Sequence, residues 1–222
     1  MTQRQVLYAG GAFAVATLLC IFLVDGVVAV AAQSFSREFL KGVGAFMHGL
    51  ELAFLFPLSK WASGAVLLLA AVIAVPFRRN LAWALLFVGL SQLTTRLVAG
   101  VLKNVFNRPR PFEALADGVW SDAFFTTGSA FPSGHAAHFW GFYFALVLLW
   151  PRGRWMLLIL PVLASAARVV VNDHYVSDVV ASAAIAAIVT LGLAKLFRGF
   201  FTKRAAANRA PSPHDEWRDG TA

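Results

Sequence analysis

Long apolar stretches, separated by short polar clusters, make up most of this chain. Stretches of about 18 or more mostly apolar residues are typical of helices that span a membrane. The fourth and fifth stretches are short for a hydrocarbon core about 30 Å thick. The pattern predicts an all-α, polytopic membrane protein with a six-helix transmembrane bundle. The predicted spans are 6–25, 58–77, 81–102, 135–150, 155–171 and 178–197.

The segment between the first two spans has a helical period. Its large apolar residues recur at steps of three and four from Phe35 to Phe54, which is the spacing of one helix face. Arg37, Lys41 and Glu51 fall largely on other faces. Residues 34–56 therefore predict one or two amphipathic helices that lie in the outer interface, or else a helix that packs on the bundle.

Composition indicates a single membrane domain, because 59% of the 222 residues are hydrophobic and a soluble domain would need more polar surface. We expect this domain to cover residues 1–200. Residues 201–222 lose the hydrophobicity and predict a disordered cytoplasmic tail. Cys20, the single cysteine, lies in the first span, so an intrachain disulfide is excluded. Ala29-Val30-Ala31 resembles a signal-peptidase site, and cleavage there would leave five spans.

Basic residues predict the orientation, because cytoplasmic loops are enriched in Lys and Arg. We expect both termini in the cytoplasm, and the loops 112–130 and 172–177 outside. The net charge of +8 is explained by attraction to the inner leaflet and by an anion site. Nucleic acid is excluded as a partner, because no basic stripe alternates with aromatic residues. The residues on the predicted cytoplasmic side include Arg4, Arg78, Arg79, Arg152, Arg154, Lys195, Arg198, Lys203 and Arg204.

Three polar clusters interrupt the later apolar runs. The chain has Lys103-x6-Arg110-Pro, then Pro-Ser-Gly-His at residues 132–135, then Arg168-x5-His174-x3-Asp178. In this order and spacing the clusters resemble the signature of the type 2 phosphatidic acid phosphatase superfamily. The resemblance implies a bacterial-type integral-membrane lipid phosphatase.

Physical arguments independent of the resemblance also indicate a phosphate. With six spans, the three clusters lie on one side of the membrane, and basic groups near membrane depth need an anion or another partner. The fork of Arg110 can hold two phosphate oxygens, while Lys103 acts as a point charge. Ser133 and Gly134 begin a helix, where free backbone N–H groups bind anions. Ser133 could equally be only the helix N-cap.

The two histidines receive different roles. If residues 174–178 are helical, Asp178 shares a face with His174 and holds one imidazole nitrogen, which leaves the other free to attack phosphorus. The resemblance implies that His174 forms a phosphohistidine and that His135 protonates the leaving oxygen and then activates water. Charge on the phosphoryl oxygens would be stabilised by Lys103, Arg110, Arg168, Ser133 and the Gly134 amide. Without a cluster of metal ligands, we expect no metal and no cofactor.

Three further residues lie near these clusters. Arg108 is expected to contact the headgroup or to support the site, and His138 to support it. Arg96 lies seven residues before Lys103 on the same helix face, about 10 Å deeper. An intramembrane arginine needs a partner, so Arg96 either pairs with Glu51 or Asp25 or contacts a second phosphate of a long substrate.

The function predicted from sequence is hydrolysis of a phosphate monoester or pyrophosphate on a membrane lipid. We expect the site on the periplasmic face of a bacterial inner membrane, with the lipid substrate and the bilayer as partners; the sequence has no signal for oligomeric state. Candidate substrates are lipid A phosphate, phosphatidylglycerol phosphate, undecaprenyl pyrophosphate and phosphatidic acid. The alternatives are a lipid phosphotransferase that uses the same histidines and, from another class, a non-catalytic phosphate-binding membrane protein or transporter.

Overall fold

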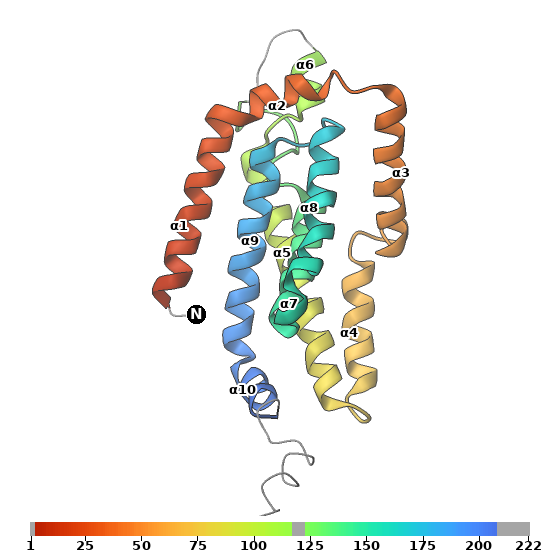
Figure 1. Ribbon diagram of the computed structural model, residues 1–222, viewed down its shortest axis with the longest axis vertical. Coiled ribbons are helices and arrows are strands. Elements are labelled where there is room, and N and C mark those ends of the chain that lie inside the picture. The colour runs from red at the N-terminus through yellow and green to blue at the C-terminus, as the bar shows by residue number, and fades with distance from the viewer. Residues whose placement is uncertain (1–2, 117–122, 208–222) are drawn as a thin grey trace, which may run out of the picture.

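The computed structural model describes residues 3–116 and 123–207, and helices joined by turns and loops are their regular secondary structure (Figure 1). The all-α prediction is therefore confirmed for these residues. The helices are α1 (Gln3–Leu19), the π-helix η1 (Cys20–Val24), α2 (Asp25–Ala32), α3 (Arg37–Ala53), α4 (Ala62–Ala74), α5 (Arg79–Phe106), α6 (Pro111–Ala116), α7 (Gly134–Leu149), the 3₁₀ turn η2 (Pro151–Gly153), α8 (Arg154–Val170), α9 (Val176–Leu196) and α10 (Arg198–Ala207).

Four helical stretches among the described residues are long and apolar enough to cross a membrane. They are Gly11–Ala32, Arg79–Ala116, Pro151–Val170 and Val176–Leu196. The predicted second and fourth spans correspond to α4 and α7, which are apolar but only 13 and 16 residues long. The chain is thus an all-helical membrane protein with four candidate spans, and the count of six spans stays a prediction.

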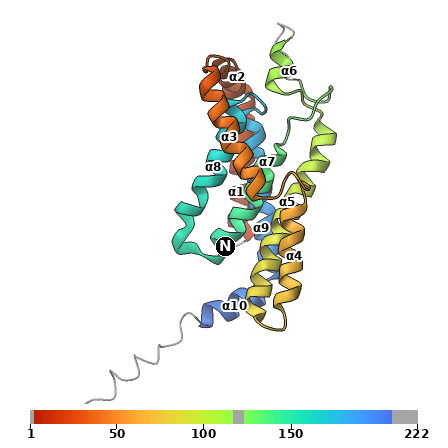
Figure 2. The ribbon, with the colours of Figure 1, turned by 90° about the vertical axis from the view of Figure 1, so that its right-hand side faces the viewer.

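The bundle centres on α5, α7 and α9, with α4 packed on α5 and α8 packed on α7 (Figures 1 and 2). Small residues allow these helices to approach closely, as is common where helices pack in a membrane. A Cβ atom built on Gly141 of α7 would lie only 2.9 Å from the Thr95 side chain of α5. Ala145 and Ala186 are also fully buried. This tight packing fixes the ends of α5, α7, α8 and α9 relative to one another.

Helix α3 packs along the bundle rather than lying across it (Figures 1 and 2). Its apolar face includes Met47 and Leu50, which contact a cluster formed by Phe139, Ala164 and Ala167. Of the two arrangements that the sequence allowed for residues 34–56, the structure therefore has the helix packed on the bundle.

Both ends of the chain differ from the prediction. The first helical stretch does not end at residue 25 but continues through η1 and α2 to Ala32, and Asp25 is fully buried. Residues 201–207 belong to α10, where we predicted a disordered tail. The rest of that predicted tail, 208–222, and residues 117–122 of the predicted outer loop lie outside the described residues.

Candidate active site

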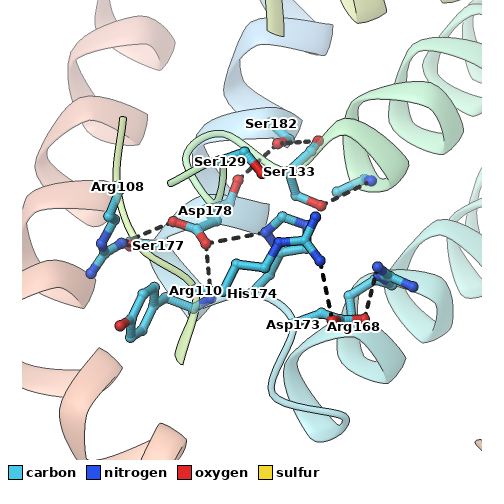
Figure 3. Close-up of polar contacts among 12 residues, drawn as sticks. Arg108, Arg110, Ser129, Ser133, Arg168, Asp173, His174, Ser177, Asp178 and Ser182 are labelled. Carbon is cyan, nitrogen blue, oxygen red and sulfur yellow. Dashed lines mark hydrogen bonds and ion pairs between the residues drawn. The ribbon is translucent and has the colours of Figure 1, made fainter. Parts of the chain in front are cut away.

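The three polar clusters meet at one end of the bundle. Helix α5 ends at Phe106, and its C-cap Asn107 has a φ of 40°, which lies in the left-handed region. Pro109 and Pro111 then prevent the helix from continuing. The chain turns there, so that Arg110 lies beside the turn that joins α8 to α9 (Figure 3).

His174 and Asp178 form a contact, although not for the reason that the sequence suggested. His174 Nδ1 lies 3.2 Å from Asp178 Oδ2 (Figure 3). We predicted that both residues would share a helix face, but α9 begins at Val176, so His174 lies in the preceding turn. The contact arises because Asp178 is in the first turn of α9 and its Oδ2 also accepts the Tyr175 N–H at 2.9 Å. Among the described residues, none hydrogen-bonds to His174 Nε2.

Asp178 is itself held by a buried ionic network that the sequence did not reveal. Arg108 Nη1 donates to Asp178 Oδ1 at 2.9 Å, and Arg108 Nη2 donates to Asp25 Oδ2 at 2.8 Å. All three side chains are 0% exposed. Asp25 also accepts hydrogen bonds from the backbone N–H and hydroxyl of Ser177, at 2.9 and 2.5 Å. The Arg108 guanidinium stacks 3.7 Å from the Tyr175 ring centroid. Arg108 is therefore a supporting residue and not a headgroup contact.

Burial sets the charge of His174. Its side chain is 2% exposed. Desolvation lowers the pKa of His174 below its usual 6.5, and the hydrogen bond to Asp178 opposes that change. The neutral imidazole is therefore favoured, which is the form with a lone pair for attack.

His135 has a carboxylate partner of its own. Its Nε2 lies 3.0 Å from Glu51 Oε1, and its ring stacks on Phe56 at a centroid distance of 5.0 Å. Glu51 comes from α3, 84 residues earlier in the chain. From the sequence, Glu51 was one of two acids that could pair with Arg96, and no local pattern linked it to His135. Both histidines of the motif are thus oriented by an acidic side chain.

The cations of the motif lie together around His174. Asp173 bridges two of them, at 2.8 Å from Arg168 Nη2 and 3.4 Å from Arg110 Nη1 (Figure 3). Lys103 donates to the backbone carbonyl of Ser129. Sequence reasoning missed Asp173 because it lies between motif positions.

The start of α7 supplies backbone rather than side-chain contacts. The Ser133 hydroxyl is buried and accepts the Ala136 N–H at 3.3 Å, so Ser133 is the N-cap of α7. This matches the second of the two roles we gave it. Gly134 and His135 follow at the first helical positions, where N–H groups have no helical acceptor.

A cavity of about 270 Å³ joins these parts. A larger apolar groove of about 930 Å³ lies between α7, α8, α9 and Phe13 of α1, but it shares no lining residue with this cavity and offers no catalytic group. The residues that line the smaller cavity are Lys60, Trp61, Arg96, Gly100, Lys103, Arg110, Ser129, Gly134, His135 and His174.

His138 and Arg96, the other two residues near the motif, lie in different surroundings. His138 is 1% exposed and lies behind His135, with its Nε2 2.8 Å from Gln92 Nε2. It therefore supports α7 from inside the bundle. Arg96 does line the cavity, and its Nη1 donates to the Gly134 carbonyl at 2.8 Å.

The PAP2 superfamily model matches residues 80–201, which is more than half of the chain. The chain belongs to the PAP2 superfamily. A lipid A 1-phosphatase of Rhizobium johnstonii is 38% identical over 104 residues, which cover 46% of this chain and 43% of that protein. A lipid A 1-phosphatase of Rhizobium etli is 36% identical over 91 residues, covering 40% and 39%. The alignments thus span less than half the length of these two relatives.

The fold also matches a solved PAP2 structure. The transmembrane PAP2 type phosphatidylglycerolphosphate phosphatase from Bacillus subtilis superposes with a TM-score of 0.58 over 88% of this chain and 97% of that one. The two sequences are 21% identical, so the likeness concerns the fold. The match includes most of α1 to α4, which precede the segment that the family model covers.

Proposed function

We propose that this PAP2 protein is a phosphatase that removes phosphate from a membrane lipid through a phosphohistidine and without a metal ion. The observation that carries the proposal is the position of His174, which lines a cavity together with Lys103 and Arg110 and has its Nδ1 within 3.2 Å of Asp178 Oδ2. A protein that only binds phosphate needs the cations, but it does not need a nucleophile with an orienting acid.

The first step would form a bond from His174 Nε2 to phosphorus. Asp178 keeps the proton on Nδ1 and stabilises the positive charge that develops on the ring. The electron pair of the breaking P–O bond leaves with the lipid oxygen, and His135 donates a proton to that oxygen. Lys103, Arg110 and Arg168 supply the positive charge around the phosphoryl oxygens that a metal ion supplies in other phosphatases.

The second step would transfer the phosphoryl group to water. His135, now neutral, takes a proton from the attacking water, and Glu51 stabilises the resulting imidazolium at 3.0 Å. The N–P bond breaks, inorganic phosphate leaves, and His174 returns to its neutral form. The same geometry allows a lipid or sugar hydroxyl to replace water, which would make the protein a phosphotransferase.

The membrane location of the site favours a lipid headgroup as the substrate. The cavity lies at the ends of apolar helices, so a bound phosphate can stay attached to chains in the bilayer. Because the two rhizobial relatives are named lipid A 1-phosphatases, we would test a lipid A phosphate first. Phosphatidylglycerol phosphate, undecaprenyl pyrophosphate and phosphatidic acid complete the set. We place the site on the periplasmic face of a bacterial inner membrane, since basic residues gather at the opposite ends of the helices.

A phosphate-release panel tests this proposal. The purified protein is incubated in detergent with each of the four lipids, and inorganic phosphate is measured against the His174→Ala variant. We expect release from at least one lipid by the wild type and none by the variant. Loss of the lipid phosphate without release of inorganic phosphate, and with labelling of an added alcohol, would identify a phosphotransferase. Release by His174→Ala at the wild-type rate would refute the mechanism.

A further inference from the structure

Arg96 is a cation inside the bundle that the catalytic steps above do not use. It projects from α5, about 10 Å deeper than Lys103 by helical rise. The two acids that we considered as partners are both engaged elsewhere: Glu51 with His135, and Asp25 with Arg108. Among the described residues, no carboxylate pairs with Arg96. A charged side chain at this depth is costly without an anionic partner.

The guanidinium of Arg96 faces the catalytic cavity. Its Nη1 donates to the Gly134 carbonyl, and a Cβ atom built on Gly134 would lie 3.7 Å from that nitrogen. The aromatic rings of Phe56 and Trp61 flank it, with centroids 5.2 and 5.7 Å from Cζ. Its Nε is buried and has no hydrogen-bond partner. The side chain is therefore fixed in place with donor capacity left over.

The scissile phosphate has cations of its own without Arg96. Lys103, Arg110 and Arg168 lie around His174, and Asp173 pairs with the two arginines. Arg96 and the nearby Lys60 line the same cavity, and neither pairs with a carboxylate among the described residues. These two cations can therefore meet a second anionic group.

We propose that Arg96 forms a second anion subsite, which binds the phosphate that links the scissile phosphate to the lipid. This inference rests on the proposed phosphatase function and narrows its substrate class to a lipid diphosphate. His174 Nε2 bonds to the terminal phosphorus while the bond from that phosphorus to the bridging oxygen breaks. The electron pair leaves with the bridging oxygen, which becomes a terminal oxygen of a lipid monophosphate. Arg96 neutralises the charge that develops there.

The depth of Arg96 fits this orientation. The chains of a lipid point toward the membrane centre, so the phosphate attached to the lipid lies deeper than the terminal one. Arg96 is on the membrane side of Lys103 along α5, where the inner phosphate would lie. A terminal phosphate at His174 and an inner phosphate at Arg96 would then both meet cations from a single helix.

A pair of substrates tests the subsite. A polyprenyl monophosphate and the diphosphate of the same chain length are compared as substrates for the wild type and for Arg96→Gln, which keeps a donor toward Gly134. We expect Arg96→Gln to lower kcat/KM by about 10- to 100-fold on the diphosphate, since hydrogen bonds to charged groups contribute about 1.5–3 kcal/mol. The loss on the monophosphate should be several-fold smaller. Arg96→Lys should recover part of the loss on the diphosphate. Arg152→Gln, which changes an exposed cation of η2 just before α8, serves as the matched control and should affect both substrates equally.

A binding measurement separates failure of the subsite from failure of the proposed function. Inorganic pyrophosphate and phosphate are compared for their ability to raise the thermal unfolding temperature in detergent. Pyrophosphate should stabilise the wild type more than phosphate does, and Arg96→Gln should remove that difference. If neither lipid is hydrolysed but this difference persists, the phosphatase proposal fails and the anion subsite stands. Equal losses on both substrates in Arg96→Gln, or equal stabilisation by both anions, would overturn the subsite.

Discussion

Asp25→Asn tests whether the buried network behind Asp178 matters for catalysis. The substitution keeps an oxygen for the Ser177 N–H but removes the charge that faces Arg108 Nη2 at 2.8 Å. Removing one partner of a buried ion pair costs about 3–5 kcal/mol, which is a large fraction of the 5–15 kcal/mol that stabilises a typical domain. We expect a folded protein with a clearly lower unfolding temperature.

The expected effect on turnover depends on the two partners of Asp178, which are Arg108 and His174. Once Asp25 is neutral, Asp178 is the carboxylate left for Arg108, and the guanidinium draws it away from His174. The His174–Asp178 contact is already long, at 3.2 Å. Complete loss of such an orienting carboxylate costs about 10⁴-fold in kcat in the serine proteases. A weakened contact should cost part of that, about 10- to 100-fold in kcat, or about 1.4–2.8 kcal/mol. KM should change little, because Asp25 does not line the cavity.

Phosphate release at saturating lipid, measured below the unfolding temperature of each variant, separates turnover from stability. A double variant, Asp25→Leu with Arg108→Met, replaces the ion pair with apolar side chains of similar length. Such replacements are often neutral or stabilising, so the unfolding temperature should recover. The kcat should rise above that of Asp25→Asn, because the guanidinium that draws Asp178 away from His174 is gone. A wild-type kcat in folded Asp25→Asn, or a kcat in the double variant no higher than that of Asp25→Asn, would contradict this account.

The remaining predictions concern the nucleophile, the pH profile, metals and orientation. His174→Ala should remove turnover without unfolding the protein, and Asp178→Asn should be severely impaired; full activity of the first in a phosphate-release assay would rule out the phosphohistidine. Burial lowers the pKa of His174 below 6.5 and attack needs the neutral ring, so kcat/KM should hold as the pH falls through 6.5 and decline only below it. An acidic limb centred above 6.5 would contradict this assignment. Activity should survive excess EDTA, and a loss that Mg²⁺ or Zn²⁺ restores would require another mechanism. In a Cys20→Ser background, a cysteine at Asp117 should react with an impermeant thiol reagent added outside, and one at Arg152 should not; the reverse labelling would place catalysis on the cytoplasmic face.

Local patterns predicted the helices and the meeting of the three clusters. The apolar runs located α5, α7, α8 and α9 to within a few residues, since the apolar character of a run is a local property. The predicted reason for the contact between His174 and Asp178 was wrong, because this contact depends on how α9 begins and not on helical periodicity. Residues 174–178 satisfy the helical spacing rule, yet the turn before α9 and the first-turn position of Asp178 create the contact instead.

Long-range partners could not be predicted from sequence. Asp25 and Arg108 are 83 residues apart, and no periodicity links them. Glu51 and His135 are also far apart in the sequence, by 84 residues. On a predicted amphipathic helix, the position of Glu51 indicates only a solvent-exposed face. The sequence left Arg108 as either a headgroup contact or a supporting residue, because burial cannot be seen in a run of polar residues. In each case the pairing depends on how α2 and α3 pack, which tertiary structure alone decides.

The carboxylates that support the two histidines come from two parts of the chain. Asp178, which orients the nucleophile, belongs to the segment that matches the PAP2 model, residues 80–201. Asp25 and Glu51 belong to α2 and α3, which precede that segment, yet each lies within hydrogen-bonding distance of a catalytic histidine or its support. In the proposed mechanism, attack by His174 would depend on Asp25 through Arg108 and Asp178. Protonation of the leaving oxygen and activation of water would depend on Glu51, and hence on how α3 packs against the bundle. A change in the N-terminal helices would therefore alter both steps while every residue of the family motif stays in place.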